Sequence, residues 1–198
     1  MKVVNRRCHQ GQIVSNSAGF QCTAIALDAL ITVCTVNPAF FTPDTIDYIV
    51  LNGHQMHHQL ISQSNNPTPR FLRHWELPHY VQQNNESIEI HRHENILNGV
   101  VGMDSNFPFT TVSIEEALPM AFSISNYFIC TFGDITIAIF RLDRSEQWFI
   151  FDSHSRNSTG ITNPFGTATI IELSNYEQCV QFLRQNYEGR LLKSHSSI

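Results

Sequence analysis

The amino-acid sequence predicts an α+β fold built as a single domain. Nearly all residues from 22 to about 36 are apolar, which is typical of a helix buried on most of its sides. Three strands follow closely on one another, at 126–132, 135–142 and 146–152, and the short turns between them indicate an antiparallel meander. A capping box at 174–177 opens a last helix. Helices, then a sheet, then a closing helix are the order expected of an α+β domain.

Simpler signals place the segments around the buried helix. Residues 1–21 are expected to form an extended arm and loop that lead to it. A cap at Thr42, followed by a proline and an acid, predicts a second helix that reaches about Ser62, with Gly53 as its weak point. The segment from about 190 to 198 is expected to be a loose tail.

The middle of the chain carries weaker signals. Residues 87–91 alternate between polar and apolar, which predicts a strand, and the stretch around Val100 does so less clearly. A capping box at 113–116 opens a short helix that Pro119 should curtail. A further strand is expected at 168–173, before the last helix.

The composition limits the classes of partner. The chain has 198 residues, of which 42% are hydrophobic, and a formal net charge of −5, which argues against a nucleic-acid partner. No stretch approaches the ~20 apolar residues of a membrane span, and the N-terminus shows no secretory signal. Five cysteines without a C-x-x-C pair favour free thiols in a reducing, intracellular compartment. Chemistry-bearing residues by position 10 favour a domain of a larger polypeptide.

Cys22 is the candidate nucleophile. A polar loop containing Gly19 leads to it, and it opens the buried helix. The partial positive charge of a helix N-terminus and its unpaired N–H groups favour a thiolate there. The alternative is a small buried hydrophobe, which is what most free cysteines are.

Asp152 and His154 are the candidate partners of this thiol. Both follow an apolar run, 148–151, that is typical of a buried strand. Side chains two apart on a strand point to the same side, so the carboxylate can accept from one imidazole nitrogen and leave the other free to take a proton. The alternative is a surface histidine beside an unrelated aspartate. A cysteine that opens a helix, followed far along the chain by such a pair, resembles the residue order of papain-like enzymes.

An oxyanion needs hydrogen-bond donors. The Cys22 backbone N–H is one, and a side-chain amide from Gln10, Gln12 or Gln21 would be the other. Gln21 adjoins the nucleophile and should point elsewhere. Gln10 is therefore the first candidate and Gln12 the second.

These motifs resemble those of a known family. His9-Gln10-Gly11, the run 18–22 and the run 151–157 resemble the active-site segments of the herpesvirus large-tegument-protein deubiquitinases and their tegument-like relatives. The resemblance extends over nearly the whole chain. It implies a papain-like cysteine protease fold, in which the buried helix carries the nucleophile and packs on a mainly antiparallel sheet.

The resemblance also implies a function. It implies thiol hydrolysis of the isopeptide bond after the terminal glycine of ubiquitin or of polyubiquitin chains, with Cys22, His154 and Asp152 as triad, Gln10 at the oxyanion, and no cofactor. One alternative is a Cys-His-Asp protease or acyltransferase acting on another ubiquitin-like modifier or peptide. An alternative of another class is an inactive ubiquitin-binding domain.

Three further features bear on specificity. Ser155 stands where many deubiquitinases have an aromatic residue, which suggests a wider channel or one walled by another residue. Asp104, Glu115 and Glu116 would steer a basic tail, or they are ordinary helix-start acids. The loop 156–167 follows the histidine directly and is a candidate substrate-gripping loop.

Histidines and the other cysteines have simpler explanations. His54, His57 and His58 on the second helix raise a metal alternative, but no cysteine pair or acidic ligand completes a site, so no metal is expected. Three other cysteines are expected in the hydrophobic core: Cys34 on the buried helix, Cys130 on a strand and Cys179 on the last helix.

Overall fold

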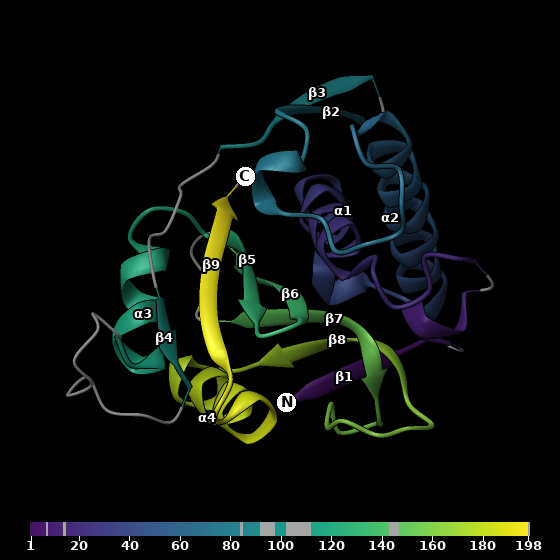
Figure 1. Ribbon diagram of the computed structural model, residues 1–198. Coiled ribbons are helices and arrows are strands. Elements are labelled where there is room, and N and C mark those ends of the chain that lie inside the picture. The colour runs from purple at the N-terminus through teal and green to yellow at the C-terminus, as the bar shows by residue number, and fades with distance from the viewer. Residues whose placement is uncertain are drawn as a thin grey trace.

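The computed structural model describes the chain except residues 7, 14, 84, 92–97, 102–111, 143–146 and 198, and it describes residues 98–100 and 191–197 by their backbone. A seven-stranded sheet and four α-helices make up most of it (Figure 1). The helices are α1 (Cys22–Thr35), α2 (Pro43–Gln63), α3 (Ile114–Phe122) and α4 (Tyr176–Tyr187). The short 3-10 helices are η1 (Gln10–Gln12), η2 (Pro38–Phe40) and η3 (His74–Glu76).

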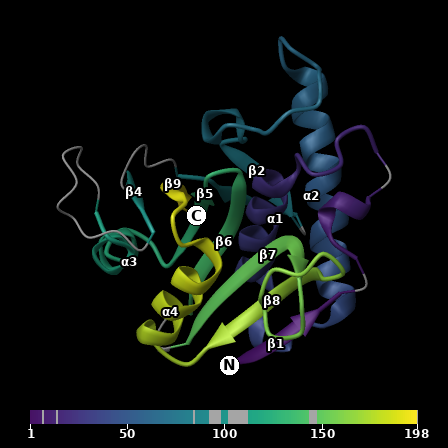
Figure 2. The same ribbon diagram turned by 60° about the horizontal axis from the view of Figure 1, so that its bottom comes forward.

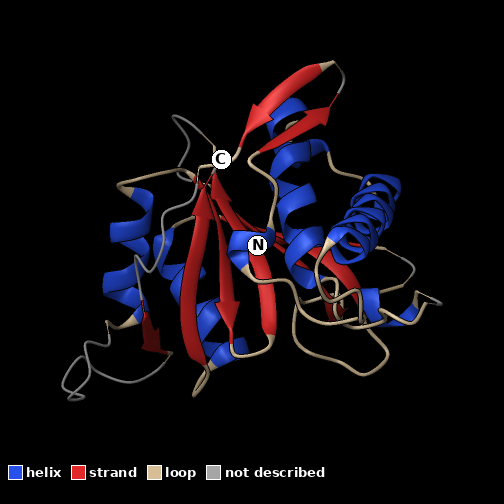
Figure 3. Cartoon of the chain, turned by 45° about the horizontal axis from the view of Figure 1, so that its top comes forward, coloured by secondary structure: helices blue, strands red, loops and turns tan. Residues whose placement is uncertain are grey.

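All strand pairs of the large sheet are antiparallel. In order across the sheet, the strands are β1 (Lys2–Asn5), β8 (Thr167–Leu173), β7 (Trp148–Arg156), β6 (Ile135–Arg141), β5 (Tyr127–Phe132), β9 (Leu191–Ser197) and β4 (Asn98–Val100). A separate hairpin pairs β2 (Tyr80–Gln83) with β3 (Glu86–Glu89) and lies beside α1 and α2 (Figure 3).

The large sheet separates two hydrophobic cores because alternate residues of a strand point to opposite faces. On β7, Phe149 and Phe151 pack with α1 and α2, whereas Trp148 and Ile150 pack with α3 and α4. Figure 2 shows α4 on the opposite side of β6, β7 and β8 from α1 and α2. Every helix therefore has an apolar sheet face to cover.

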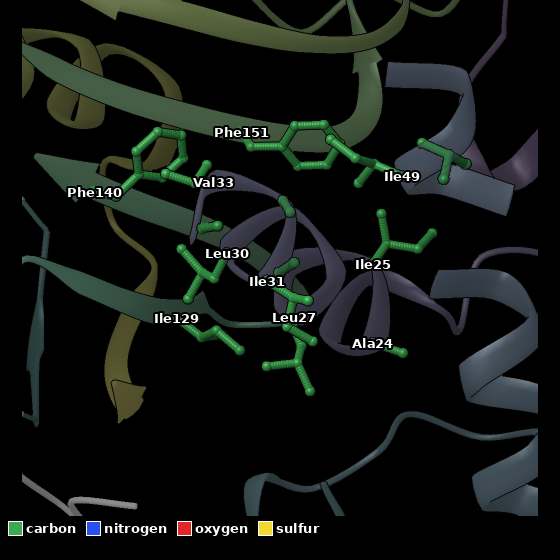
Figure 4. Packing of buried hydrophobic residues seen from close by; sticks show 14 of the residues in the cluster. Ala24, Ile25, Leu27, Leu30, Ile31, Val33, Ile49, Ile129, Phe140 and Phe151 are labelled. Carbon is green, nitrogen blue, oxygen red and sulfur yellow. The ribbon is translucent and has the colours of Figure 1, made fainter. Parts of the chain in front are cut away.

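Helix α1 is the centre of the first core. Its residues from Cys22 to Val33 are buried, as expected for a helix that is apolar on most sides. Figure 4 shows its side chains packed between Phe140 and Phe151 of the sheet on one side and Ile49 of α2 on another. The first residue of this helix, Cys22, is therefore held by a rigid interior.

Gly53 is the point of closest approach between α1 and α2. A Cβ atom built there would overlap the Cα of Ile25 and lie 2.8 Å from its Cγ1. The sequence marks this glycine as a weak point of α2, but the helix runs through it without a break. Its lack of a side chain allows the two helix backbones to touch.

The predicted antiparallel meander is confirmed as β5, β6 and β7, and the strand predicted at 168–173 is confirmed as β8. The predicted turn at 143–145 lies outside the described residues. The prediction of a loose tail is wrong, because residues 191–197 form β9 between β5 and β4. Helix α3 continues through Pro119 to Phe122, so the proline does not end the helix at its own position.

Two further findings concern the cysteines and the absence of a membrane-spanning helix among the described residues. The Cys34 residue is exposed, so its placement in the core was wrong, whereas Cys130 and Cys179 are buried as predicted. In the part of the chain that the structure describes, no helix is long and apolar enough to cross a membrane.

Substituting Gly53→Ala should destabilise the protein, because the added methyl group would push α1 and α2 apart. We expect a loss of about 1–3 kcal/mol in the free energy of unfolding, measured by chemical denaturation. The control is Gln59→Ala, at an exposed position of the same helix, which should change stability little. Equal stability of Gly53→Ala and the wild type would contradict the close packing described for this position.

Candidate active site

The candidate site lies where β7 leaves the regular sheet. Asp152 pairs with Thr169 of β8, but the next paired residue of β7 is Arg156, opposite Thr167. Three residues of β7, 153–155, therefore lie opposite one residue of β8. Such a bulge redirects side chains, and it allows His154 to leave the regular alternation.

Asp152 and His154 are in direct contact, as their spacing predicts. The Asp152 carboxylate is completely buried, and its Oδ1 accepts from the His154 backbone N–H at 2.8 Å and from Nδ1 of the ring at 2.7 Å. With Nδ1 acting as the donor, Nε2 is the nitrogen that faces other partners. The aspartate therefore sets both the orientation and the tautomer of the imidazole.

Cys22 completes this row of side chains from the other end. Its thiol lies close enough to the His154 side chain and to Thr136 for both residues to lower the pKa of the thiol. The structure thus brings Cys22, at the start of α1, together with Asp152 and His154 of β7, although about 130 residues separate them in the sequence.

Electrostatics favour charges on all three groups. Burial alone would raise the pKa of Cys22, but the neighbouring His154 and the Thr136 hydrogen bonds outweigh it and lower that pKa. Burial opposes the charged form of His154 as well, but Asp152 and Cys22 raise its pKa above the ordinary value of 6.5. For Asp152, the positive charges of Arg156 and His154 overcome burial and hold the pKa well below its usual range. A thiolate, an imidazolium and a carboxylate are the expected states near neutral pH.

The three candidate glutamines occupy different surroundings. Gln10 opens η1, is 3% exposed, and its Oε1 accepts from the Ser153 hydroxyl at 3.2 Å. This bond leaves the Gln10 amide NH₂ free of Ser153, and the residue lines the same cavity as His154. Gln12 is exposed and its Oε1 accepts from the His9 backbone N–H. The Gln21 side chain contacts the Gly19 N–H and His54, so it points elsewhere, as expected.

A cavity of about 360 Å³ opens beside His154. Gln10 and Gly19 line it, together with Phe71, which packs edge-on against Phe20 at 5.0 Å between ring centroids. Ser155 lines it too, and Phe71 adds an aromatic side chain to its wall from another segment.

The sulfur of Cys22 has no exposed surface and lies under the turn between β5 and β6. The backbone oxygen of Asp134, in that turn, is 3.9 Å from Sγ, and Asp134 also lines the cavity. An ion pair of 2.6 Å joins its carboxylate to Arg190, which follows α4. This turn therefore covers the sulfur on the side of the cavity.

The acids expected to steer a substrate have structural partners. Glu116 caps α3 by accepting from the Ser113 backbone N–H at 3.0 Å, and Glu115 pairs with Arg184 of α4 at 2.5 Å. Neither lines the cavity beside His154. Asp104 lies outside the described residues.

The histidines of α2 also have partners within the chain. His54 contacts the Gln21 amide at 3.3 Å, and the His57 Nε2 lies 2.9 Å from the Arg70 oxygen. Among the described residues, no group of three or more His, Cys, Asp or Glu side chains is arranged to hold a metal ion.

Two residues of the site were missed or misplaced by the sequence analysis. Arg156 was placed in the loop that follows the histidine, but it ends β7, is 1% exposed, and pairs with Asp152. Tyr187, at the end of α4, donates to the same carboxylate. An arginine four residues after the aspartate, beyond a bulge, gives no periodic signal that would have revealed this contact.

Comparison with known proteins identifies the family. A family model described as the herpesvirus tegument protein, N-terminal conserved region, matches residues 7–196. Among curated protein sequences, no match is found. Among solved structures, the chain is similar to the ubiquitin-specific protease encoded by a murine cytomegalovirus tegument protein, in complex with a ubiquitin-based suicide substrate. The two are 16% identical with a TM-score of 0.75, and the match covers 99% of this chain and 85% of that one.

This likeness confirms the predicted α+β, papain-like fold. The family model spans almost the entire sequence, including every residue of the candidate site described above. The chain therefore belongs to the family of the herpesvirus tegument protein N-terminal conserved region.

Proposed function

We propose that this protein is a deubiquitinase, a cysteine protease that hydrolyses the bond after the C-terminal glycine of ubiquitin. The observation that carries the proposal is the row Cys22–His154–Asp152, in which a carboxylate in contact with the base orients it and the base lowers the pKa of the nucleophile. The family and the fold support it, since a solved structure of the same fold is a ubiquitin-specific protease.

In the first half of the reaction, the Cys22 thiolate attacks the carbonyl carbon of the terminal glycine. The carbonyl oxygen becomes an oxyanion, which the Cys22 backbone N–H and the Gln10 amide stabilise. The His154 imidazolium then gives its proton to the leaving lysine amine as the carbon–nitrogen bond breaks. The products of this half are the free lysine and a thioester between Cys22 and ubiquitin.

In the second half, His154 is neutral and takes a proton from water, which attacks the thioester carbonyl. The carbon–sulfur bond breaks, the thiolate and imidazolium are restored, and the new carboxylic acid of ubiquitin releases its proton to the solvent as a carboxylate. Throughout, Asp152 holds the imidazole in place, so that the same nitrogen delivers and accepts the proton.

The cavity suits a chain terminus without side chains. Gly19 has a positive φ of 87°, and open space lies where its Cβ would be, while Phe71 forms a wall of the same cavity. The Asp134 turn covers the sulfur, so we infer that a bound ubiquitin tail displaces this turn. Action on polyubiquitin chains, an intracellular location and a place within a larger polypeptide stay predictions of the sequence.

Replacing the nucleophile should abolish covalent capture of ubiquitin. We expect wild-type protein to form a 1:1 adduct with ubiquitin that carries a C-terminal electrophile, and Cys22→Ala to form none, as measured by intact-protein mass spectrometry. Cys34→Ala is the matched control, because it removes an exposed thiol from the same helix, and it should label at the wild-type rate.

The same assay separates the alternatives. Preferential labelling by a probe built on another ubiquitin-like modifier would favour a protease for that modifier. Binding of ubiquitin without an adduct, unchanged by Cys22→Ala, would identify an inactive binding domain and contradict the proposal.

The pH dependence of kcat/KM on a ubiquitin fluorogenic substrate should be bell-shaped. The Cys22 pKa is lowered, so the thiolate persists until the pH falls below that lowered value, and the His154 pKa is raised, so the imidazolium is lost only as the pH rises above 6.5. Activity should therefore span neutral pH. A single rising limb near the ordinary thiol pKa of about 8.5 would show that no such ion pair forms.

Gln10→Ala should lower kcat by roughly 100-fold with little change in KM, because an oxyanion donor acts in the transition state alone. Gln12→Ala, two residues away and exposed, is the control and should retain near wild-type kcat. The opposite ranking of these two variants would transfer the oxyanion role to Gln12.

A further inference from the structure

The carboxylate of Asp152 divides its contacts between its two oxygens. Oδ1 faces His154, as described above. Oδ2 accepts from Arg156 Nε at 2.7 Å, from Arg156 Nη2 at 2.6 Å and from the Tyr187 hydroxyl at 2.7 Å. One oxygen is thus used for the candidate base, and the other is held by a guanidinium and a phenol.

The groups that hold Oδ2 are themselves fixed. Arg156 Nη2 donates to the Tyr187 hydroxyl at 2.8 Å, and Nη1 donates to Asn186 Oδ1 at 2.8 Å and to the Thr162 hydroxyl. The guanidinium also lies 5.1 Å from the centroid of the Tyr187 ring. Tyr187 has no exposed surface, and its ring stacks on Phe132 at 4.4 Å. A rigid anchor therefore stands behind the aspartate.

The charges of this row alternate and cancel. The Cys22 thiolate, the His154 imidazolium, the Asp152 carboxylate and the Arg156 guanidinium carry −1, +1, −1 and +1. Without Arg156, the other three residues of the row would together keep one uncompensated negative charge, which is costly in a protein interior. The anchor also joins the two faces of the sheet, since Tyr187 belongs to α4 and Cys22 to α1.

We propose that Arg156 and Tyr187 are positioning residues for the reaction, holding Asp152 so that Oδ1 meets His154 in the orientation that stabilises the Cys22 thiolate. This inference rests on the proposed function. In physical terms, it says that contacts made by α4 alter the pKa of the Cys22 thiol. Neither residue touches the substrate in this scheme. Each acts through the carboxylate.

Other charged groups face the same row. His9 lies within electrostatic range of His154, and Arg190 within range of Tyr187. Burial and the Asp152 charge raise the Tyr187 pKa well above its ordinary value, so this hydroxyl stays protonated and donates throughout the working pH range. The effect of this anchor on the site is therefore measured through the pKa of the Cys22 thiol.

The test compares Tyr187→Phe with Tyr176→Phe. Both remove one hydroxyl from α4, but the Tyr176 hydroxyl donates to the Glu115 backbone oxygen, far from the aspartate. The rate of alkylation of Cys22 by iodoacetamide is followed against pH by peptide mass spectrometry. Cys34, exposed on the same helix, serves as the internal reference. kcat and KM for a ubiquitin fluorogenic substrate are measured alongside.

For Tyr187→Phe, we expect the pH at which the rate of Cys22 alkylation rises, the acid limb of the profile, to increase by about one unit. We also expect kcat to fall about 10-fold at unchanged KM, because the variant loses a hydrogen bond to the charged Asp152 carboxylate. Tyr176→Phe should move neither. Asn186→Ala, at a half-buried position, loosens Arg156 while leaving the core intact and should shift the limb in the same direction by less.

A folded Tyr187→Phe protein with wild-type alkylation profile and kcat would overturn the inference. If Tyr187→Phe does not fold, a wild-type profile in Asn186→Ala would overturn it instead. Alkylation needs no ubiquitin, so the two proposals are separable. A wild-type protein that is inert toward ubiquitin would refute the function, and the shift of the alkylation limb would still decide the positioning role.

Discussion

The structure depends on one buried carboxylate. Asp152 has no contact with solvent, yet it carries a charge, and such a charge is stable in an interior only when every lone pair is met by a donor. His154 meets one oxygen, and Arg156 with Tyr187 meets the other. The end of β7, the end of α4 and the start of α1 converge on this group, so the site and the packing of the two cores share one constraint.

The bulge in β7 explains how residues from opposite faces of a sheet form one site. The strand alternates regularly up to Asp152, which faces α4, as Trp148 and Ile150 do. Beyond it, three residues lie opposite one, and His154 reaches the thiol on the α1 side. Ser153, the first of these three residues, contacts Gln10 of the N-terminal arm. A regular strand would have separated these partners.

Local patterns predicted much of this arrangement. The apolar run after Cys22 and the turn residues predicted α1 and the meander, because each signal lies within a few residues. The Asp-x-His spacing placed two partners together for the same reason. The last helix was predicted too, but Asn175 caps α4 in place of the capping box expected at 174–177. The prediction of a loose tail was wrong because β9 forms by pairing with β5, some 60 residues away in the chain. The polar residues of this segment show no local pattern that predicts such pairing.

The contacts of Arg156 and Tyr187 were not predictable for a related reason. They join residues far apart in the chain across a bulge, and neither an arginine nor a tyrosine shows a pattern for a partner of that kind. Similarly, the burial of Sγ under the Asp134 turn is a property of the folded hairpin. Sequence motifs do not reveal this cover over the sulfur.

The central claim is that Cys22 and His154 form an ion pair. The most direct measurement is the ¹⁵N NMR titration of the His154 ring in wild-type protein and in Cys22→Ala. The account predicts an imidazolium that persists well above pH 6.5 in the wild type and a lower His154 pKa in the variant, where the thiolate is gone. A His154 ring that titrates near 6.5 and is unaffected by Cys22→Ala would contradict it.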